Sequence, residues 1–116
     1  MISIIIPTRN ESQVIVSILS PLQKLRKTNI CEIILVDGSS SDNTVDISKK
    51  FVDHVLIVNP CRANQQNIGA SVAKGNILLF LHADTYISYE QLRNLDEMSQ
   101  KIKWGFFKLS FTNKNI

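Results

Sequence analysis

The chain has 116 residues, of which 44% are hydrophobic and 20% are charged. This length suits one domain with a single core, and the composition is that of a folded protein rather than a disordered one. The formal net charge of +3 is small and the basic residues are scattered. This gives no support to a nucleic-acid-binding protein and weakly favours an anionic ligand.

No apolar stretch approaches the ~20 residues needed to span a bilayer, so we expect no transmembrane segment. Met1 leads directly into ISIIIP, without the basic region or small-residue cleavage site of a signal peptide, which predicts a cytoplasmic protein. The cysteines agree with that location. Cys31 and Cys61 fall at opposite ends of two neighbouring predicted strands, too far apart for a disulfide, so both thiols are expected to be free.

Short apolar runs rich in β-branched residues alternate with amphipathic stretches along the chain. The runs predict parallel strands covered on both faces, at Ile2–Ile6, Glu32–Val36, His54–Val58 and Ile77–Leu81. A fifth segment, Trp104–Phe111, is aromatic and also strand-like.

Helices are predicted between these strands. Val14–Lys27 has apolar residues at helical spacing, although Pro21 should kink or interrupt it. Asp42 and Thr44 offer caps for a short helix that ends at Phe51. The remaining two helices are expected over Ala63–Lys74, closed by Gly75, and from the capping-box residue Ser88 to about Lys101.

The order βαβαβαβαβ predicts an α/β fold, a Rossmann-like open sheet that is mainly parallel with right-handed crossovers. Ligands of such sheets bind outside the carboxyl ends of the strands, where the strand order reverses. If the order is 3-2-1-4, the segments after strands one, two and four line one crevice. Those segments are Thr8–Glu11, Asp37–Asp42 and His82–Asp84.

Two of these segments contain candidate ligand-binding groups. Asp37 is followed by small polar residues that allow a tight turn, and its carboxylate can accept hydrogen bonds from a ribose or a base. The alternative is that Asp37 merely ends a strand and Asp42 or Ser41 caps the next helix. Asp84 can hold Mg²⁺ or Mn²⁺ between two phosphates, and His82 can add a nitrogen ligand that suits Mn²⁺ better. In the alternative, Asp84 caps a turn and His82 is an interior histidine.

Arg62 stands at the start of the third predicted helix, in the loop after the third strand. A guanidinium beside a helix amino terminus is a suitable partner for a phosphate. A solvent-facing role is the alternative for Arg62, and the glutamines that follow it are expected to be structural or solvated.

Four motifs in this order make the chain similar to family 2 glycosyltransferases, which have the A-type nucleotide-sugar fold. The P-T-x-N-E segment is Pro7–Glu11, the D-D-G-S-S-D-G-T loop corresponds to Asp37–Thr44, the N-x-G-x-x-x-A-x-G helix contains Asn67, Gly69, Ala73 and Gly75, and the D-x-D position holds His82-Ala83-Asp84. The sequence departs from the family pattern at Gly38, which replaces a second aspartate, and at His82, which replaces the first aspartate of D-x-D.

The resemblance implies a site for a UDP- or GDP-linked sugar. Thr8, Glu11 and Asp37 would cradle the nucleoside, Arg62 would approach the base or a phosphate, and Asp84 would hold Mn²⁺ or Mg²⁺ on the diphosphate. The reaction implied is inverting transfer of the sugar to an unknown acceptor.

An inverting transfer needs a carboxylate base for the acceptor hydroxyl, and none follows Glu97. Family members are also longer, so residues 1–116 are expected to be the donor-binding part of a truncated nucleotide-diphospho-sugar transferase fold. The alternative is a catalytically silent nucleotide-binding or assembly module, whose exposed sheet edge would favour pairing with a second copy. A receiver-like signalling domain is disfavoured, because only Glu11 approaches the acidic pair it needs after the first strand.

Overall fold

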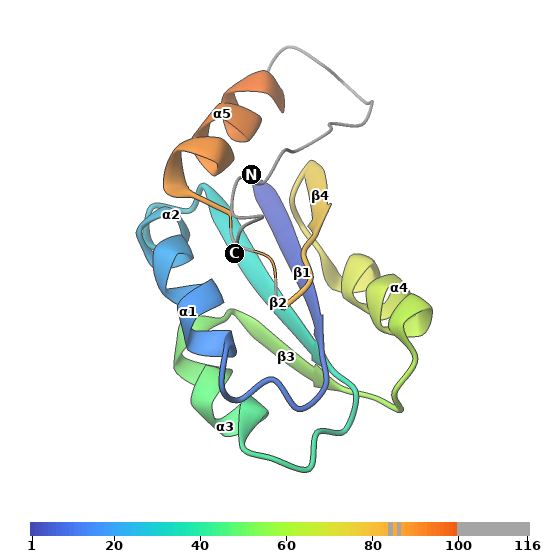
Figure 1. The fold of residues 1–116 in the computed structure, drawn as a ribbon. Coiled ribbons are helices and arrows are strands. Elements are labelled where there is room, and N and C mark those ends of the chain that lie inside the picture. The colour runs from blue at the N-terminus through green and yellow to red at the C-terminus, as the bar shows by residue number, and fades with distance from the viewer. Residues whose placement is uncertain (84, 86, 100–116) are drawn as a thin grey trace.

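The computed structural model describes residues 1–83, 85 and 87–99 as a parallel sheet covered by helices (Figure 1). The strands are β1 (Ile2–Thr8), β2 (Cys31–Asp37), β3 (His54–Ile57) and β4 (Ile77–Phe80). Their order is β3-β2-β1-β4 and every pair is parallel, so the predicted α/β class and strand order are confirmed. The strand-like segment from 104 to 111 lies outside the described residues.

The helices follow the predicted positions. They are α1 (Ile15–Leu19), the 3₁₀ turn η1 (Ser20–Leu22), α2 (Gln23–Lys27), α3 (Thr44–Ser48), the 3₁₀ turn η2 (Lys49–Phe51), α4 (Arg62–Val72) and α5 (Tyr89–Ser99). The predicted interruption at Pro21 is confirmed, because Pro21 lies in η1 and separates α1 from α2. Within the described ranges, none of the helices is both long and apolar enough to cross a membrane.

The two central strands separate two apolar layers. β1 and β2 are buried along their whole length. Ile4 and Leu35 belong to the larger layer, together with buried residues of α1, α2 and α5, whereas Ile5 and Val36 pack against α4 on the other face (Figure 1). Continuous apolar runs suit these strands because both of their faces are covered.

The outer strands correct the sequence prediction, which expected all four strands to be covered on both faces. Among the described residues, β3 and β4 form the edges of the sheet. Ile57 is 61% exposed, and Leu78 and Phe80 are 44% and 42% exposed. For Leu78 and Phe80 the reason is the position of α4, which packs on β1 and β2 and leaves the same face of β4 uncovered.

Gly75 also has a different role from the one predicted. The helix that it was expected to close ends at Val72, and Ala73 already has an extended backbone. At Gly75 a Cβ atom would lie 2.5 Å from the carbonyl oxygen of Met1 and 2.7 Å from Ser3 Oγ. The glycine is therefore required by the close approach of the chain to β1.

The predicted capping box at the start of α5 is confirmed. The backbone N–H of Gln91 donates to Ser88 Oγ at 3.1 Å, and the backbone N–H of Ser88 donates to Gln91 Oε1 at 2.9 Å. The two bonds satisfy N–H groups that a helix start leaves unpaired.

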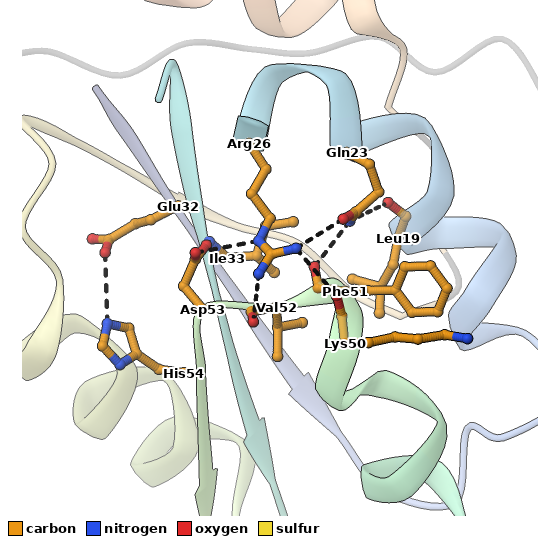
Figure 2. Close-up of polar contacts among 10 residues, drawn as sticks. All are labelled: Leu19, Gln23, Arg26, Glu32, Ile33, Lys50, Phe51, Val52, Asp53 and His54. Atoms are coloured by element: carbon orange, nitrogen blue, oxygen red, sulfur yellow. Dashed lines mark hydrogen bonds and ion pairs between the residues drawn. The ribbon is translucent and has the colours of Figure 1, made fainter. Parts of the chain in front are cut away.

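Arg26 fastens α2 to the segment that leads into β3 (Figure 2). Its guanidinium donates to the carbonyl oxygens of Lys50 and Val52 and lies 3.2 Å from Asp53 Oδ1. The other oxygen of Asp53 accepts the backbone N–H of Ile33 at 2.8 Å, so the network reaches β2. These bonds fix the helical layer against the edge of the sheet.

Glu32 is a buried carboxylate at the opposite end of the sheet from the predicted crevice. It accepts hydrogen bonds from Ser3 Oγ and from the backbone N–H of Lys74, both at 2.6 Å. His54 lies with Nε2 at 3.8 Å from Glu32 Oε1 (Figure 2). The bonds within this cluster explain why a carboxylate is buried there.

Close packing at Gly69 predicts the effect of a side chain there. A Cβ atom at this position would lie 2.4 Å from Ile5 Cγ2 and 3.0 Å from Val36 Cγ2. Gly69→Val should therefore lower the free energy of unfolding by about 2–3 kcal/mol through overpacking. The matched control is Ser71→Val, which introduces the same side chain at an exposed position of α4. Urea unfolding measures both, and equal losses would contradict the packing argument.

Candidate functional site

The carboxyl ends of β1 and β2 meet because Thr8 and Asp37 are paired in the sheet register. Thr8 Oγ1 donates to Asp37 Oδ1 at 2.8 Å. Ser40 adds two bonds, from its hydroxyl to Asp37 Oδ1 at 2.6 Å and from its backbone N–H to Oδ2 at 2.7 Å. Asp37 is only 1% exposed, so its buried carboxylate holds the loop that follows β2. The structure thus brings the predicted Thr8 and Asp37 together.

Asn10 connects the loop after β1 to the loop after β2. Its backbone has a φ of 55°, a left-handed conformation that asparagine tolerates better than most residues. Asn10 Oδ1 accepts the backbone N–H of Ser41, and the N–H of Asn10 donates to Ser40 Oγ, both at 2.8 Å. The two loops are therefore joined across about thirty positions of sequence.

Asp42 and Thr44 extend this connection. The backbone N–H of Ser12 donates to Asp42 Oδ2 at 3.2 Å, and that of Glu11 donates to Thr44 Oγ1 at 2.9 Å. Asp42 Oδ1 accepts the backbone N–H of Thr44 at 3.0 Å, but the N-cap of α3 is Asn43, so the predicted cap Asp42 lies one residue before the cap position. Hydrogen bonding, above all from the Thr44 hydroxyl, lowers the pKa of Asp42 from 3.8 to about 2.

Gln65 joins the start of α4 to both central strands. Its side-chain Nε2 donates to the carbonyl oxygens of Thr8 at 3.1 Å and Val36 at 2.8 Å. Its Oε1 accepts the backbone N–H of Cys61 at 3.0 Å. The residue is 4% exposed, and the expectation of a structural role is confirmed for this glutamine.

A pocket of about 170 Å³ opens at the end of β1. It is lined by Pro7, Thr8, Arg9, Glu11, Arg62 and Gln65. Of the residues predicted to bind the nucleotide, Thr8, Glu11 and Arg62 line this pocket, and Asp37 contacts it through Thr8. The topology has gathered groups from β1, the following loop and α4 around one space.

Arg62 and His82 are in contact at the same edge of the sheet. Arg62 Nη1 lies against His82 Nδ1, and both residues are exposed. The predicted role of His82 as a metal ligand stays a prediction. Asp84, the other predicted ligand, lies outside the described residues. The part of the chain that is described contains no group of three or more His, Cys, Asp or Glu side chains able to hold a metal.

Sequence reasoning missed two groups that build this site, Asn10 and Ser40, and it did not place the structural glutamine Gln65 at the site. Asn10 and Ser40 belong to the quoted motifs, but their roles depend on a contact between two loops that no local pattern reveals. Gln65 follows Arg62 by three positions, which places both near the start of one helix. The available signal for Gln65 was a polar residue at a buried position of α4. This signal can be interpreted only once the strand order is known.

The family model described as glycosyl transferase family 2 matches residues 3–102. The chain belongs to glycosyltransferase family 2. It is 32% identical over 101 residues to the poly(ribitol-phosphate) beta-N-acetylglucosaminyltransferase TarS of Staphylococcus aureus, covering 79% of this chain and 18% of that protein. It is 37% identical over 93 residues to a PGL/p-HBAD biosynthesis glycosyltransferase of Mycobacterium tuberculosis, covering 72% of this chain and 35% of the relative.

Solved structures agree with these relatives. The crystal structure of S. aureus TarS 1–349 superposes with a TM-score of 0.75 at 28% identity, covering 86% of this chain and 32% of that one. The same protein in complex with UDP-GlcNAc gives a TM-score of 0.74 at 29% identity, with 86% and 31% covered. The chain thus spans about a third or less of each of these proteins. The fold is that of the amino-terminal part of TarS.

The bonds of Asp42 predict how the two loops respond to acid. The folded-state pKa of Asp42 lies below its ordinary value. The carboxylate is therefore fully ionised above about pH 4 and keeps its hydrogen bonds between the two loops. These bonds are lost as the pH falls through 2. In hydrogen exchange of the intact chain, protection of the backbone N–H groups of Ser12 and Thr44 should persist down to pH 4. Loss of that protection between pH 7 and pH 5 would contradict this assignment.

Asp42→Asn replaces one accepting oxygen with a donor, so exchange at Ser12 should become several-fold faster. Asp46→Asn is the matched control, since its side chain in α3 is 80% exposed and pairs only with Lys49 among the described residues. The control should leave Ser12 unchanged.

Proposed function

We propose that this chain binds a nucleotide sugar in the pocket at the end of β1, as the donor-binding part of an inverting glycosyltransferase whose acceptor is unknown. The observation that supports this most is the convergence of Thr8, Glu11 and Arg62 on that pocket. It lies outside the carboxyl ends of parallel strands, where ligands of such sheets bind. TarS, which has a similar fold, has been solved with UDP-GlcNAc bound.

The proposed roles follow the chemistry of each group. Glu11 is half-buried and can accept hydrogen bonds from ribose hydroxyls or base N–H groups. Arg62 is exposed and offers a cation to the diphosphate. Thr8 shapes the pocket, with its hydroxyl committed to Asp37, and Asp37 itself fixes the loop against which the nucleoside would lie. Among UDP- and GDP-linked donors, the likeness to TarS favours UDP.

The Mn²⁺ or Mg²⁺ ion implied by the family remains a prediction that rests on Asp84. The role of His82 as a second ligand of that ion also remains a prediction. A cytoplasmic location and a donor domain made of residues 1–116 also remain proposals.

A catalytically silent nucleotide-binding or assembly module is the second candidate. Among the described residues that line the pocket, Glu11 is the one carboxylate, and it lies on the proposed nucleoside side. The exposed Leu78 and Phe80 of β4 give such a module an apolar edge through which two copies could pair. The two candidates share nucleotide binding and differ in turnover.

Nucleotide binding and turnover can be measured side by side on the intact chain. UDP should raise the thermal midpoint, GDP should raise it less, and uncharged sugars should leave it unchanged. Release of UDP from UDP-sugars then separates the candidates, because the silent module binds without release. If no nucleoside diphosphate stabilises the chain, both candidates are wrong.

Asp84→Ala tests the predicted metal ligand. It should remove any additional stabilisation that Mn²⁺ gives to the UDP complex, because a carboxylate is the ligand that such ions prefer. Asp46→Ala is the matched control, as an exposed carboxylate on α3. An unchanged Mn²⁺ effect in Asp84→Ala would exclude Asp84 as the ligand.

A further inference from the structure

We infer that Gln65 is a positioning residue of the proposed nucleotide site. Its buried amide holds the first turn of α4, which carries Arg62, beside the end of β1. The inference rests on the proposed function, because it needs a nucleotide phosphate for Arg62 to bind. It goes further by assigning part of the nucleotide affinity to a side chain that acts through a neighbour.

Three hydrogen bonds hold the amide of Gln65 in one orientation. Nε2 donates to the carbonyl oxygens of Thr8 at 3.1 Å and Val36 at 2.8 Å, and Oε1 accepts the backbone N–H of Cys61 at 3.0 Å. A flipped amide would place Oε1 against two carbonyl oxygens, so the opposite orientation is excluded. Because the amide has only two N–H groups and both are used, Gln65 has no donor left for a phosphate.

Gln65 also closes the first turn of α4. Its backbone N–H donates to the carbonyl oxygen of Cys61 at 2.8 Å, while its side chain accepts the N–H of the same residue. Cys61 is the N-cap of α4, and its own side chain makes no capping bond. The glutamine thus satisfies an N–H group that a helix start leaves unpaired, as the acceptor of a capping box does. Arg62 follows Cys61 directly, so the amide sets where the backbone of Arg62 lies.

Gly38 leaves the space that this amide occupies. A Cβ atom at position 38 would lie 3.1 Å from Gln65 Oε1 and 3.0 Å from Cα of Pro60. Either the amide or the loop before α4 would then have to shift by a few tenths of an ångström. Gly38 stands where the family pattern has a second aspartate. In this chain the glycine at position 38 and the glutamine at position 65 are therefore coupled by packing.

Loss of the amide should affect Arg62 more than Thr8. Thr8 has two further bonds to the end of β2, from its hydroxyl to Asp37 and from the N–H of Gly38 to its carbonyl oxygen, both at 2.8 Å. The first turn of α4 loses the bonds of the amide to β1 and β2 together. Because contacts between a guanidinium and a phosphate are directional, a displaced Arg62 would bind phosphate less well. The nucleoside side of the pocket would keep its wall.

Calorimetry with UDP and with uridine, both at the same Mn²⁺ concentration, tests the inference on the intact chain. The wild type should bind UDP more tightly than uridine. Gln65→Met removes the amide at similar volume and should reduce that preference about tenfold, with a smaller change in uridine binding. Gln66→Met is the matched control, since the Gln66 side chain makes no hydrogen bond to any described residue. The control should retain the full preference.

A double variant tests whether Gln65 acts through Arg62. Arg62→Ala should lower the preference for UDP over uridine. Adding Gln65→Met to Arg62→Ala should lower the preference little further, because the guanidinium that the amide positions is already absent. A glutamine that only supported the fold would lower the thermal midpoint without this coupling.

Gly38→Ala supplies a second variant that keeps every hydrogen-bonding group of the site. The added Cβ atom crowds the amide of Gln65, so the preference for UDP should fall several-fold. This variant decides the question if Gln65→Met does not fold.

The possible failures are distinguishable. If Gln65→Met and Gly38→Ala keep the wild-type preference for UDP, Gln65 supports only the fold and the inference is overturned, while nucleotide binding stands. Fully additive effects of Gln65→Met and Arg62→Ala would overturn it as well. If the wild type binds neither UDP nor uridine, the proposed function is wrong and the inference is wrong with it.

Discussion

The buried side-chain amide of Gln65 is the interaction on which the pocket depends. It bonds to the ends of β1 and β2 through Thr8 and Val36, and to the backbone N–H of Cys61 at the start of α4. An unpaired buried polar group costs about 1–3 kcal/mol, so all three segments are held in one arrangement. Arg62 lies on the helical turn that this amide fixes, and its position relative to β1 follows from it.

The polar groups around the pocket divide into those that build it and those that face a ligand. Asp37, Asn10 and Asp42 have their oxygens occupied by neighbouring N–H and hydroxyl groups, so they hold two loops together. Glu11 and Arg62 line the open space. This division changes the interpretation of Asp37, whose carboxylate would act on a nucleoside through the loop that it organises or through a remaining lone pair.

Much of the fold could be predicted from the sequence because its signals are local. The apolar runs give the strands, Pro21 divides a helix, and Ser88 with Gln91 starts another. The errors arise where an outcome depends on neighbours distant in sequence. An apolar run has the same pattern in a central strand and in β4, and only the placement of α4 exposes Phe80.

In the candidate site, as in the fold, the positions of the segments could be predicted from the sequence, whereas contacts between distant residues could not. Strand order alone gathered Thr8 and Asp37, since parallel strands bring their carboxyl ends to one edge. The partner of each side chain was not predictable, because it depends on loop contacts. Arg62 and His82 show the difference most clearly, because they are 20 positions apart and no local pattern indicates the contact between them.

Both residues of the Arg62–His82 contact are anchored to the same strand. Gln65 ties the start of α4 to the carbonyl oxygen of Thr8, and the backbone N–H of Leu81, next to His82, donates to the carbonyl oxygen of Ile5 at 2.9 Å. β1 thus sets the separation of the two groups as well as the wall of the pocket. The Arg62–His82 contact and the wall of the pocket therefore both depend on this one strand, which is the frame of the proposed nucleotide site. Sugar transfer also needs a site for the acceptor hydroxyl and a base, and this frame does not determine either of them. Donor binding and sugar transfer are therefore physically separable properties.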